Sequence, residues 1–207
     1  MNENTEYEAL WQVVAAHGWR GTTMARIAQA SGSTLGQLRG RVSAPEELII
    51  RFNRMVDQTV LDGTVPTPGE SPRDRLFDVL MRRLDALQPH RAGITRFMHD
   101  LPFHPLLTML LGAGMQRSMG WMLEAAGLGA SGPAGLARIQ GLTAVWVFTL
   151  RAWTKDESAD LATTMAALDK ALDRADQVAR SLDRAPGANA VPMDSVDPDN
   201  AAVQQKL

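Results

Sequence analysis

Apolar residues recur along much of this chain at intervals of three and four positions, which is the spacing of one face of an α-helix. Glycine and proline divide this pattern into separate segments. Nowhere do we find the alternation of apolar and polar positions that is typical of a strand. The one dense run of β-branched residues, at 145–149, lies inside a longer helical pattern. The sequence therefore predicts an all-α fold.

The first 62 residues predict four helices. Two short ones, separated by the glycine turn at 31–33, have the arrangement of a helix-turn-helix. The first helix is expected at 3–17, the second begins after a cap at Thr22 or Thr23, and the third covers 34–41. The fourth begins at the capping-box spacing Ser43-Ala-Pro45-Glu46 and runs to about residue 61.

A stretch with two prolines and two glycines, 63–69, predicts a linker between this unit and a second one at 70–183. The second unit is expected to form a core of about six helices. Helices are predicted to begin at a capped Pro72 and at Pro89, and then to cover about 106–126, 133–153 and 158–182. Residues 184–207 contain three prolines, no aromatic residue and no apolar periodicity, which predicts a disordered tail.

The composition of the 207 residues excludes several kinds of protein. Cysteine is absent, so there are no disulfides, thiolate metal sites or cysteine nucleophiles. The longest apolar run, nine residues at 142–150, is far below the ~20 that a membrane span needs. Acidic rather than basic residues precede the first apolar stretch, which is the wrong order for a signal peptide. We expect a soluble, cytoplasmic protein with no membrane span.

Two motifs resemble ligand sites but stand in the wrong context. The glycines at 127–132 match the dinucleotide-binding fingerprint, but they follow a predicted helix instead of a strand, which predicts a helix end and a loop. His99, Asp100 and His104 lie beside prolines at a spacing that favours a solvated loop over a metal site. No serine-nucleophile or P-loop motif occurs, so we expect neither enzymatic activity nor a cofactor.

Positive charge is concentrated near the N-terminus, although the whole chain has a net charge of −2. Residues 9–45 contain four arginines and no acidic residue. Such a patch suits contact with DNA phosphates, but it is also compatible with the solvated face of a three-helix bundle. Hydroxyl and amide groups at the helix starts can meet phosphates or base edges. The candidate DNA contacts are Arg20, Thr23, Arg26, Ser33, Thr34, Gln37, Arg39 and Arg41.

Residues 18–38, GWRGTTMARIAQASGSTLGQL, closely resemble the DNA-binding segment of the TetR family of transcriptional regulators. The likeness continues through 46–48, and the helix pattern over 5–183 fits the family's nine-helix layout. The resemblance implies an N-terminal DNA-reading unit, a ligand-binding helical core and dimerisation through the last two helices. It further implies that Thr23 anchors a phosphate, and that Ser33, Thr34 and Gln37 lie on the recognition helix.

The chain departs from the family pattern at several positions of this unit. Arg39 stands where the family usually has a tyrosine, Val42 where it has an aromatic residue, and Pro45 where it has a lysine. Glycines at 36 and 40 lie inside the recognition helix, each costing about 1 kcal/mol relative to alanine.

A second resemblance concerns residues 115–183. This stretch, with WTKDESADL at 153–161, is similar to the C-terminal part of the lipid-binding accessory proteins of ubiquinone biosynthesis. Those proteins share the TetR fold. The resemblance implies an alternative function, binding of a lipid or isoprenoid beside a degenerate helix-turn-helix.

Six methionines lie between Met81 and Met122, with aromatic residues among them. Thioether side chains adapt to irregular shapes, so the cluster is a candidate cavity for a small apolar effector, although for any single residue plain core packing is the favoured explanation. The candidate ligand-binding residues are Phe77, Met81, Phe97, Met98, Met119, Trp121 and Met122.

The last predicted helix carries apolar residues at alternating spacings of four and three, the pattern of a heptad seam. With the preceding apolar helix, it predicts a surface that pairs with a second copy of the chain. The candidate interface residues are Trp146, Leu150, Trp153, Leu161, Met165, Leu168 and Leu172. The leading hypothesis is a homodimeric TetR-like regulator that binds double-stranded DNA under the control of a small apolar effector.

Overall fold

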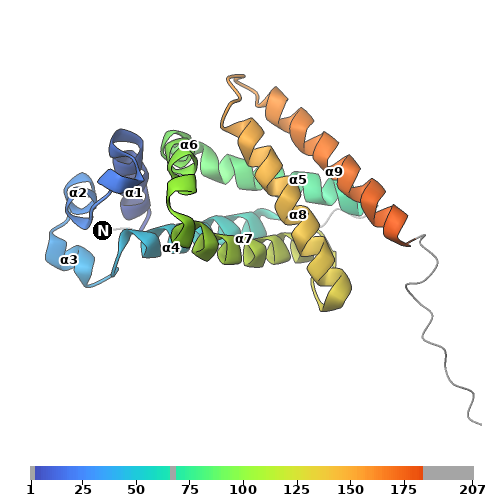
Figure 1. Ribbon diagram of the computed structural model, residues 1–207, viewed down its shortest axis with the longest axis horizontal. Helices are drawn as coiled ribbons and strands as arrows, with labels where there is room; N and C mark the ends of the chain where they lie inside the picture. Colours follow the sequence, from blue (N-terminus) through green and yellow to red (C-terminus); the bar gives the residue numbers. More distant parts are fainter. Residues whose placement is uncertain (1–2, 66–68, 184–207) are drawn as a thin grey trace, which may run out of the picture.

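The computed structural model describes residues 3–65 and 69–183. The described residues form helices and connecting turns and no strand, which confirms the all-α prediction (Figure 1). The tail predicted at 184–207 and the centre of the linker, 66–68, lie outside the described residues. No helix within the described ranges is long and apolar enough to cross a bilayer.

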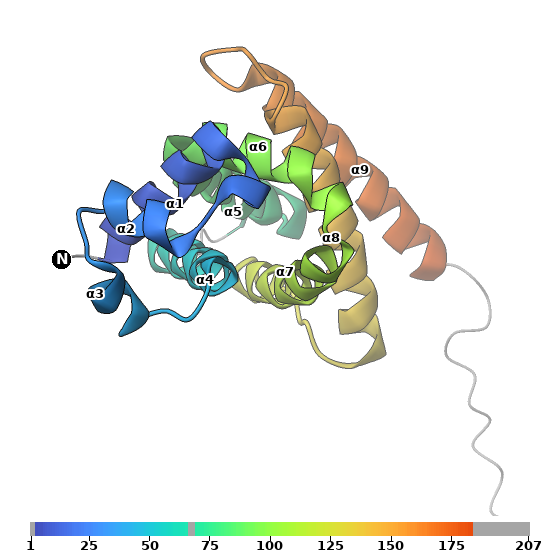
Figure 2. The same cartoon turned by 60° about the vertical axis from the view of Figure 1, so that its left-hand side comes forward.

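The first three α-helices of the N-terminal unit lie at one end of the molecule, and the fourth leads from them toward the core (Figures 1 and 2). Thr23 caps α2 by accepting a hydrogen bond from the backbone N–H of Arg26. Thr34 and Gln37 form a reciprocal capping box at the start of α3. The elements are α1 (Glu3–His17), η1 (Trp19–Gly21), α2 (Met24–Ala30), α3 (Leu35–Arg39) and α4 (Pro45–Gly63).

The start of α4 differs from the prediction. Ser43 was expected to cap this helix together with Glu46, but Ala44 occupies the cap position and makes no side-chain hydrogen bond. Instead the carboxylate of Glu47 accepts the N–H of Ser43 at 2.7 Å and contacts Arg51, two interactions that lower the pKa of Glu47. Proline favours the first helical position, because its fixed φ suits the helix and the N–H at that position has no partner within the helix, so Ala44 becomes the cap residue.

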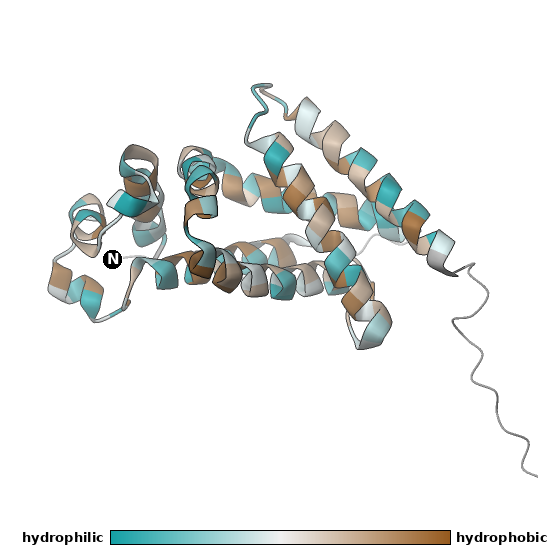
Figure 3. Ribbon diagram, viewed as in Figure 1, coloured by the Kyte–Doolittle hydropathy of each residue, from teal (hydrophilic) through white to brown (hydrophobic). Residues whose placement is uncertain are grey.

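Helix α4 leads from the N-terminal unit into the core, where α5 and α7 pack against it and against each other. Helix α6 packs on α1, and the paired helices α8 and α9 pack on α7 and on α5, respectively (Figure 2). Hydrophobic residues recur along α7 and α8 (Figure 3). The elements are α5 (Pro72–Leu87), η2 (Gln88–His90), α6 (Arg91–Asp100), η3 (Leu101–Phe103), α7 (Pro105–Ala125), α8 (Gly132–Trp153) and α9 (Ala162–Asp183).

The two motifs that resemble ligand sites, the glycines at 127–132 and the group of His99, Asp100 and His104, lie at the ends of helices. The glycine-rich segment ends α7: Gly127 adopts φ +72°, and the N–H of Leu128 bonds back to the carbonyl of Leu123 at 2.9 Å, which terminates the helix. His99 and Asp100 were expected in a loop, but they form the last turn of α6, and His104 precedes α7. Within residues 3–65 and 69–183 there is no group of three potential metal ligands.

A corner built on Asp156 joins α8 to α9 and delays the start of α9 from the predicted residue 158 to Ala162. The Asp156 carboxylate is buried and accepts hydrogen bonds from the backbone N–H and hydroxyl of both Ser158 and Thr164. Arg91 of α6 donates to the carbonyls of Trp153 and Asp156. The segment that carried the second resemblance is therefore the corner that orients the last two helices.

Asp156→Asn should make folding less sensitive to acid. The hydroxyls of Ser158 and Thr164 hold the pKa of the Asp156 carboxyl well below its ordinary value of 3.8. Because folding lowers this pKa, the ionised Asp156 stabilises the folded state fully above about pH 4, and this contribution is lost as the pH falls below that value. Urea unfolding at a series of pH values should give the variant a lower free energy of unfolding at pH 7 and a shallower fall below pH 4. Equal slopes in the two proteins would contradict this role.

Candidate nucleic-acid interface and its attachment to the core

The helix-turn-helix presents one face to solvent and packs the other against α1. Leu38 of α3 and Ile27 of α2 are fully buried, and they fix the two short helices on the N-terminal core. The opposite side carries most of the predicted DNA contacts. Arg20, Thr23, Arg26, Thr34, Gln37 and Arg39 are exposed, and Ser33 is half-buried.

The four arginines of this unit differ in their partners. Within the described ranges Arg20, Arg26 and Arg39 form no ion pair with a carboxylate, so their charges face solvent uncompensated. Arg26 donates to the carbonyl of Gly21. Arg41 instead lies 2.7 Å from the carboxylate of Glu6, which is 3% exposed. The positive patch therefore has three guanidinium groups without a carboxylate partner in the described ranges and a fourth that is paired with Glu6 of α1.

The capping residues retain donors that DNA can use. Thr34 Oγ1 accepts the N–H of Gln37, and Gln37 Oε1 accepts the N–H of Thr34. In both bonds the side chain acts as acceptor, so its hydroxyl or amide hydrogens stay available as donors. Phosphate oxygens are hydrogen-bond acceptors, so Thr34 and Gln37 can cap α3 and still donate to a phosphate.

The residues that depart from the family pattern lie partly in the core and partly on the surface of the N-terminal unit. Val42 is buried, so the missing aromatic ring is replaced by a smaller core residue. Arg39 is exposed at the end of α3, where its charge can reach a phosphate. Gly40 caps α3 in helical conformation, so the helix ends at Arg39, two residues before the predicted end at 41.

Helix α6 attaches the N-terminal unit to the core through α1 and η1. A Cβ at Gly93 would lie 2.4 Å from the carbonyl oxygen of Trp11, so the two helices cross in backbone contact. Phe97 packs edge-on against Trp11 and Trp19, with ring centroids 5.9 and 5.1 Å apart. The carboxylate of Asp100 accepts the N–H of Trp19 at 2.7 Å. A shift of α6 must therefore move α1, because the backbones of the two helices are in direct contact at Gly93 and leave no space between them.

A buried charge pair fastens α4, the second connection, to the core. Arg83 of α5 is 1% exposed and pairs with Asp57 of α4. Ser118 of α7 donates to the same carboxylate at 2.7 Å, and the guanidinium lies 5.3 Å from the ring centroid of Trp146 on α8. One polar cluster thus joins four helices. Sequence periodicity misses it, because an arginine at position 83 reads as a surface residue.

The candidate effector residues are spread over different environments. Phe97, Met119 and Met122 are buried, whereas Trp121 is 54% exposed on α7. Phe77, Met81 and Met98 are partly buried against the core. Two pockets lie elsewhere, one between α1 and α6 and one between α5 and α9, and of the seven residues only Phe77 lines either. The cavity assigned from the methionine cluster stays a prediction.

The candidate dimer residues pack inside their own chain. Trp146, Leu150, Trp153, Leu161, Leu168 and Leu172 are all buried, and Met165 is half-buried. Trp153 donates its indole N–H to Gln88 at 2.8 Å. The heptad seam of α9 is covered by α8 and α5 of the same chain. Surface apolar residues of α8 that the pattern did not single out, Val147 and Phe148, are 36% and 44% exposed.

No protein-family model and no curated protein sequence matches this chain. Solved structures do match. A TetR transcriptional regulator from Nitrosomonas europaea is 21% identical and superposes with a TM-score of 0.67 over 84% of this chain and 98% of its own. A TetR transcriptional regulator from a Rhodococcus species is 16% identical, with a TM-score of 0.60 over 83% of this chain and 93% of its own.

These structures establish the fold. Along most of its length the chain has the architecture of TetR-family transcriptional regulators, which confirms at the level of fold what residues 18–38 indicated. Fold alone does not determine function, so DNA binding has to be argued from the site. The comparisons do not favour the alternative of a lipid-binding accessory protein.

Proposed function

We propose that this chain is a homodimeric TetR-like transcriptional regulator that reads double-stranded DNA in the cytoplasm with the exposed face of α2 and α3. The observation that carries the proposal is a set of three exposed arginines that form no ion pair within the described ranges: Arg20 on η1, Arg26 on α2 and Arg39 on α3. Acidic residues outnumber basic ones in this chain, yet these three guanidinium groups have no carboxylate partner, so they contribute no ion pair to the stability of the fold. Phosphates would neutralise them and release counterions.

Selection from fragments of the source genome tests this function. The protein should enrich a small number of fragments and bind them far more tightly than random duplex, typically by a factor of about 10³ or more at physiological salt. Enriched sites should contain two half-sites one helical turn apart, or a multiple of it. Binding that is equal for all duplexes would overturn the proposal.

The exposed stripe of α8 is the surface that we propose for dimerisation. Ala137, Gly141, Ala144 and Phe148 follow helical spacing, and all four are exposed. Small residues followed by an aromatic ring let two helices approach closely around a two-fold axis. The predicted interface residues lie directly behind this stripe and support it from inside the protomer.

Phe148→Glu should convert the dimer to a monomer without unfolding it. The phenylalanine is partly exposed in the protomer, so the carboxylate is solvated in a monomer and would be buried in a dimer. Light scattering after gel filtration measures the mass, and Val65→Glu, at an exposed valine after α4, serves as the control. A variant that stays dimeric would place the interface elsewhere.

Regulation would proceed by population shift. A small effector that prefers one arrangement of the N-terminal units changes their spacing and with it the affinity for the operator. The rigid contacts of α1 with α6, and of α4 with α5, transmit such a change in either direction.

A further inference from the structure

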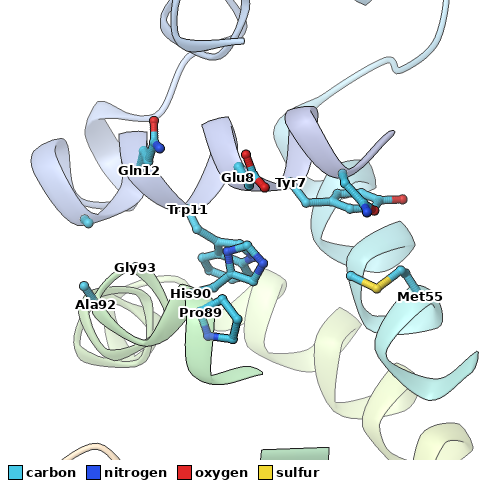
Figure 4. A pocket seen from close by; sticks show the side chains of 11 residues that line it. Tyr7, Glu8, Trp11, Gln12, Met55, Pro89, His90, Ala92 and Gly93 are labelled. Atoms are coloured by element: carbon cyan, nitrogen blue, oxygen red, sulfur yellow. The ribbon is translucent and has the colours of Figure 1, made fainter. Parts of the chain in front are cut away.

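A pocket of about 480 Å³ opens between the N-terminal unit and the core (Figure 4). Helix α1 forms one wall, η2 and the start of α6 form the opposite wall, and Met55 of α4 closes one side. The methionine-rich cluster contributes nothing to it. This pocket lies where the DNA-reading unit and the core meet.

The lining combines apolar surface with a single negative charge. Met55, Pro89 and Ala92 supply most of the apolar surface, because Tyr7 and Trp11 are 3% and 4% exposed, and Glu8 is the one carboxylate among the described lining residues. No lysine or arginine lines the pocket. Burial lowers the pKa of His90, which keeps its imidazole neutral at pH 7 in spite of the nearby Glu8. The pocket is therefore negative, and apolar surface beside a single carboxylate suits a cation with an apolar body.

Occupancy of the pocket acts on the contact that positions the N-terminal unit. Trp11 and Gly93 both line it, and they are the residues at which α1 and α6 cross in backbone contact. A molecule that fills the space touches both helices at once. Because the two helices are in backbone contact at this crossing, a ligand held there favours one position of α1 relative to α6.

We infer that this pocket binds an apolar organic cation, and that the bound cation changes the affinity of the protein for its operator. Met55, Pro89 and Ala92 contact the apolar body, and Glu8 pairs with the charge. The regulatory half of the inference depends on the proposed DNA-binding function, whereas the binding half does not.

Two ions of the same shape and opposite charge, tetraphenylphosphonium and tetraphenylborate, test the binding half by isothermal titration calorimetry on the full chain. The phosphonium should bind with one site per protomer. Glu8→Gln should weaken phosphonium binding about fivefold and leave borate binding unchanged or stronger, because only the charge at the rim is removed. Ala92→Phe, at an exposed lining position, should block the pocket to the phosphonium.

Glu157→Gln is the matched control, since Glu157 is an exposed glutamate outside the pocket. It should leave phosphonium binding unchanged. Equal affinity for the two ions, no effect of Glu8→Gln, or no binding of the phosphonium would each overturn the assignment of the pocket.

The regulatory half is tested by band shift with the selected operator. Saturating phosphonium should change the operator affinity of the unmodified protein at least threefold and that of Ala92→Phe not at all. Bound phosphonium with unchanged operator affinity would overturn regulation through this pocket. A protein that binds no specific DNA would overturn the proposed function, and with it regulation, while the calorimetric result on the pocket would stand.

Discussion

Asp57→Asn is expected to lower the free energy of unfolding by about 3–5 kcal/mol, the largest effect of any single substitution considered for this chain. The substitution keeps the size of the side chain and an oxygen for Ser118, but it removes the counterion of a guanidinium that is 1% exposed. A buried charge without a partner is far costlier than the loss of one hydrogen bond. Urea unfolding at pH 7 measures the difference.

The double variant Asp57→Asn/Arg83→Met separates the charge from the packing. Methionine keeps much of the apolar stem of Arg83 against Trp146 and carries no charge, so the double variant should recover most of the loss. Arg83→Met alone should cost less than Asp57→Asn, because Asp57 retains the Ser118 hydroxyl and some solvent. An Asp57→Asn cost below about 1 kcal/mol would mean that the pair is effectively solvated.

Gly93→Ala is expected to destabilise the chain by about 1–3 kcal/mol, although alanine is the better helix former. The added methyl group would meet the carbonyl oxygen of Trp11 at 2.4 Å, and backbone cannot rotate away as a flexible side chain can. Helix α1 must therefore shift off α6. The same variant should also bind the operator more weakly, because the N-terminal unit is no longer held in one position.

Gly112→Ala is the matched control for that experiment. Gly112 lies within α7, and a Cβ there meets nothing within 4 Å. This change should stabilise the chain by about 0.5–1 kcal/mol through helix propensity alone. Two glycines with opposite responses identify the α1–α6 crossing as the cause. Equal responses would show that the crossing can relax.

Local sequence signals predicted the elements well. The first helix covers the predicted 3–17, Thr23 is the one of the two candidate threonines that caps α2, and Ser71 caps α5. In each case the hydrogen-bonding group lies within three residues of its partner, so the sequence contains the whole interaction. The late start of α9 depends on the corner at Asp156, to which Arg91 of α6 donates from a distant part of the chain.

Periodicity predicted which faces are buried but not what buries them. The seam from Leu161 to Leu172 was assigned to a second copy, and α8 and α5 of the same chain cover it. The charge pattern had the same limit: residues 9–45 contain no acid, yet Glu6 reaches Arg41 from just outside that range. Partners that are distant in sequence are invisible to a local pattern.

The pocket beside Trp11 and the buried Arg83 pair could not be predicted for the same reason. Their residues come from separate helices, and none of them belongs to a motif. The one usable signal was a charged residue at a core position of α5, since Arg83 follows Val79 and Leu80 at helical spacing. The exposed arginines of the helix-turn-helix, by contrast, are close together in sequence and were found directly.

The salt dependence of operator binding by Arg39→Ala tests the central claim most directly. If Arg39 contacts a phosphate in each half-site, the slope of log affinity against log salt concentration should fall by about two for a dimer, one unit for each lost contact. Arg174→Ala, at an exposed arginine of α9, should leave the slope unchanged. An Arg39→Ala slope equal to that of the unmodified protein would contradict DNA reading by this face.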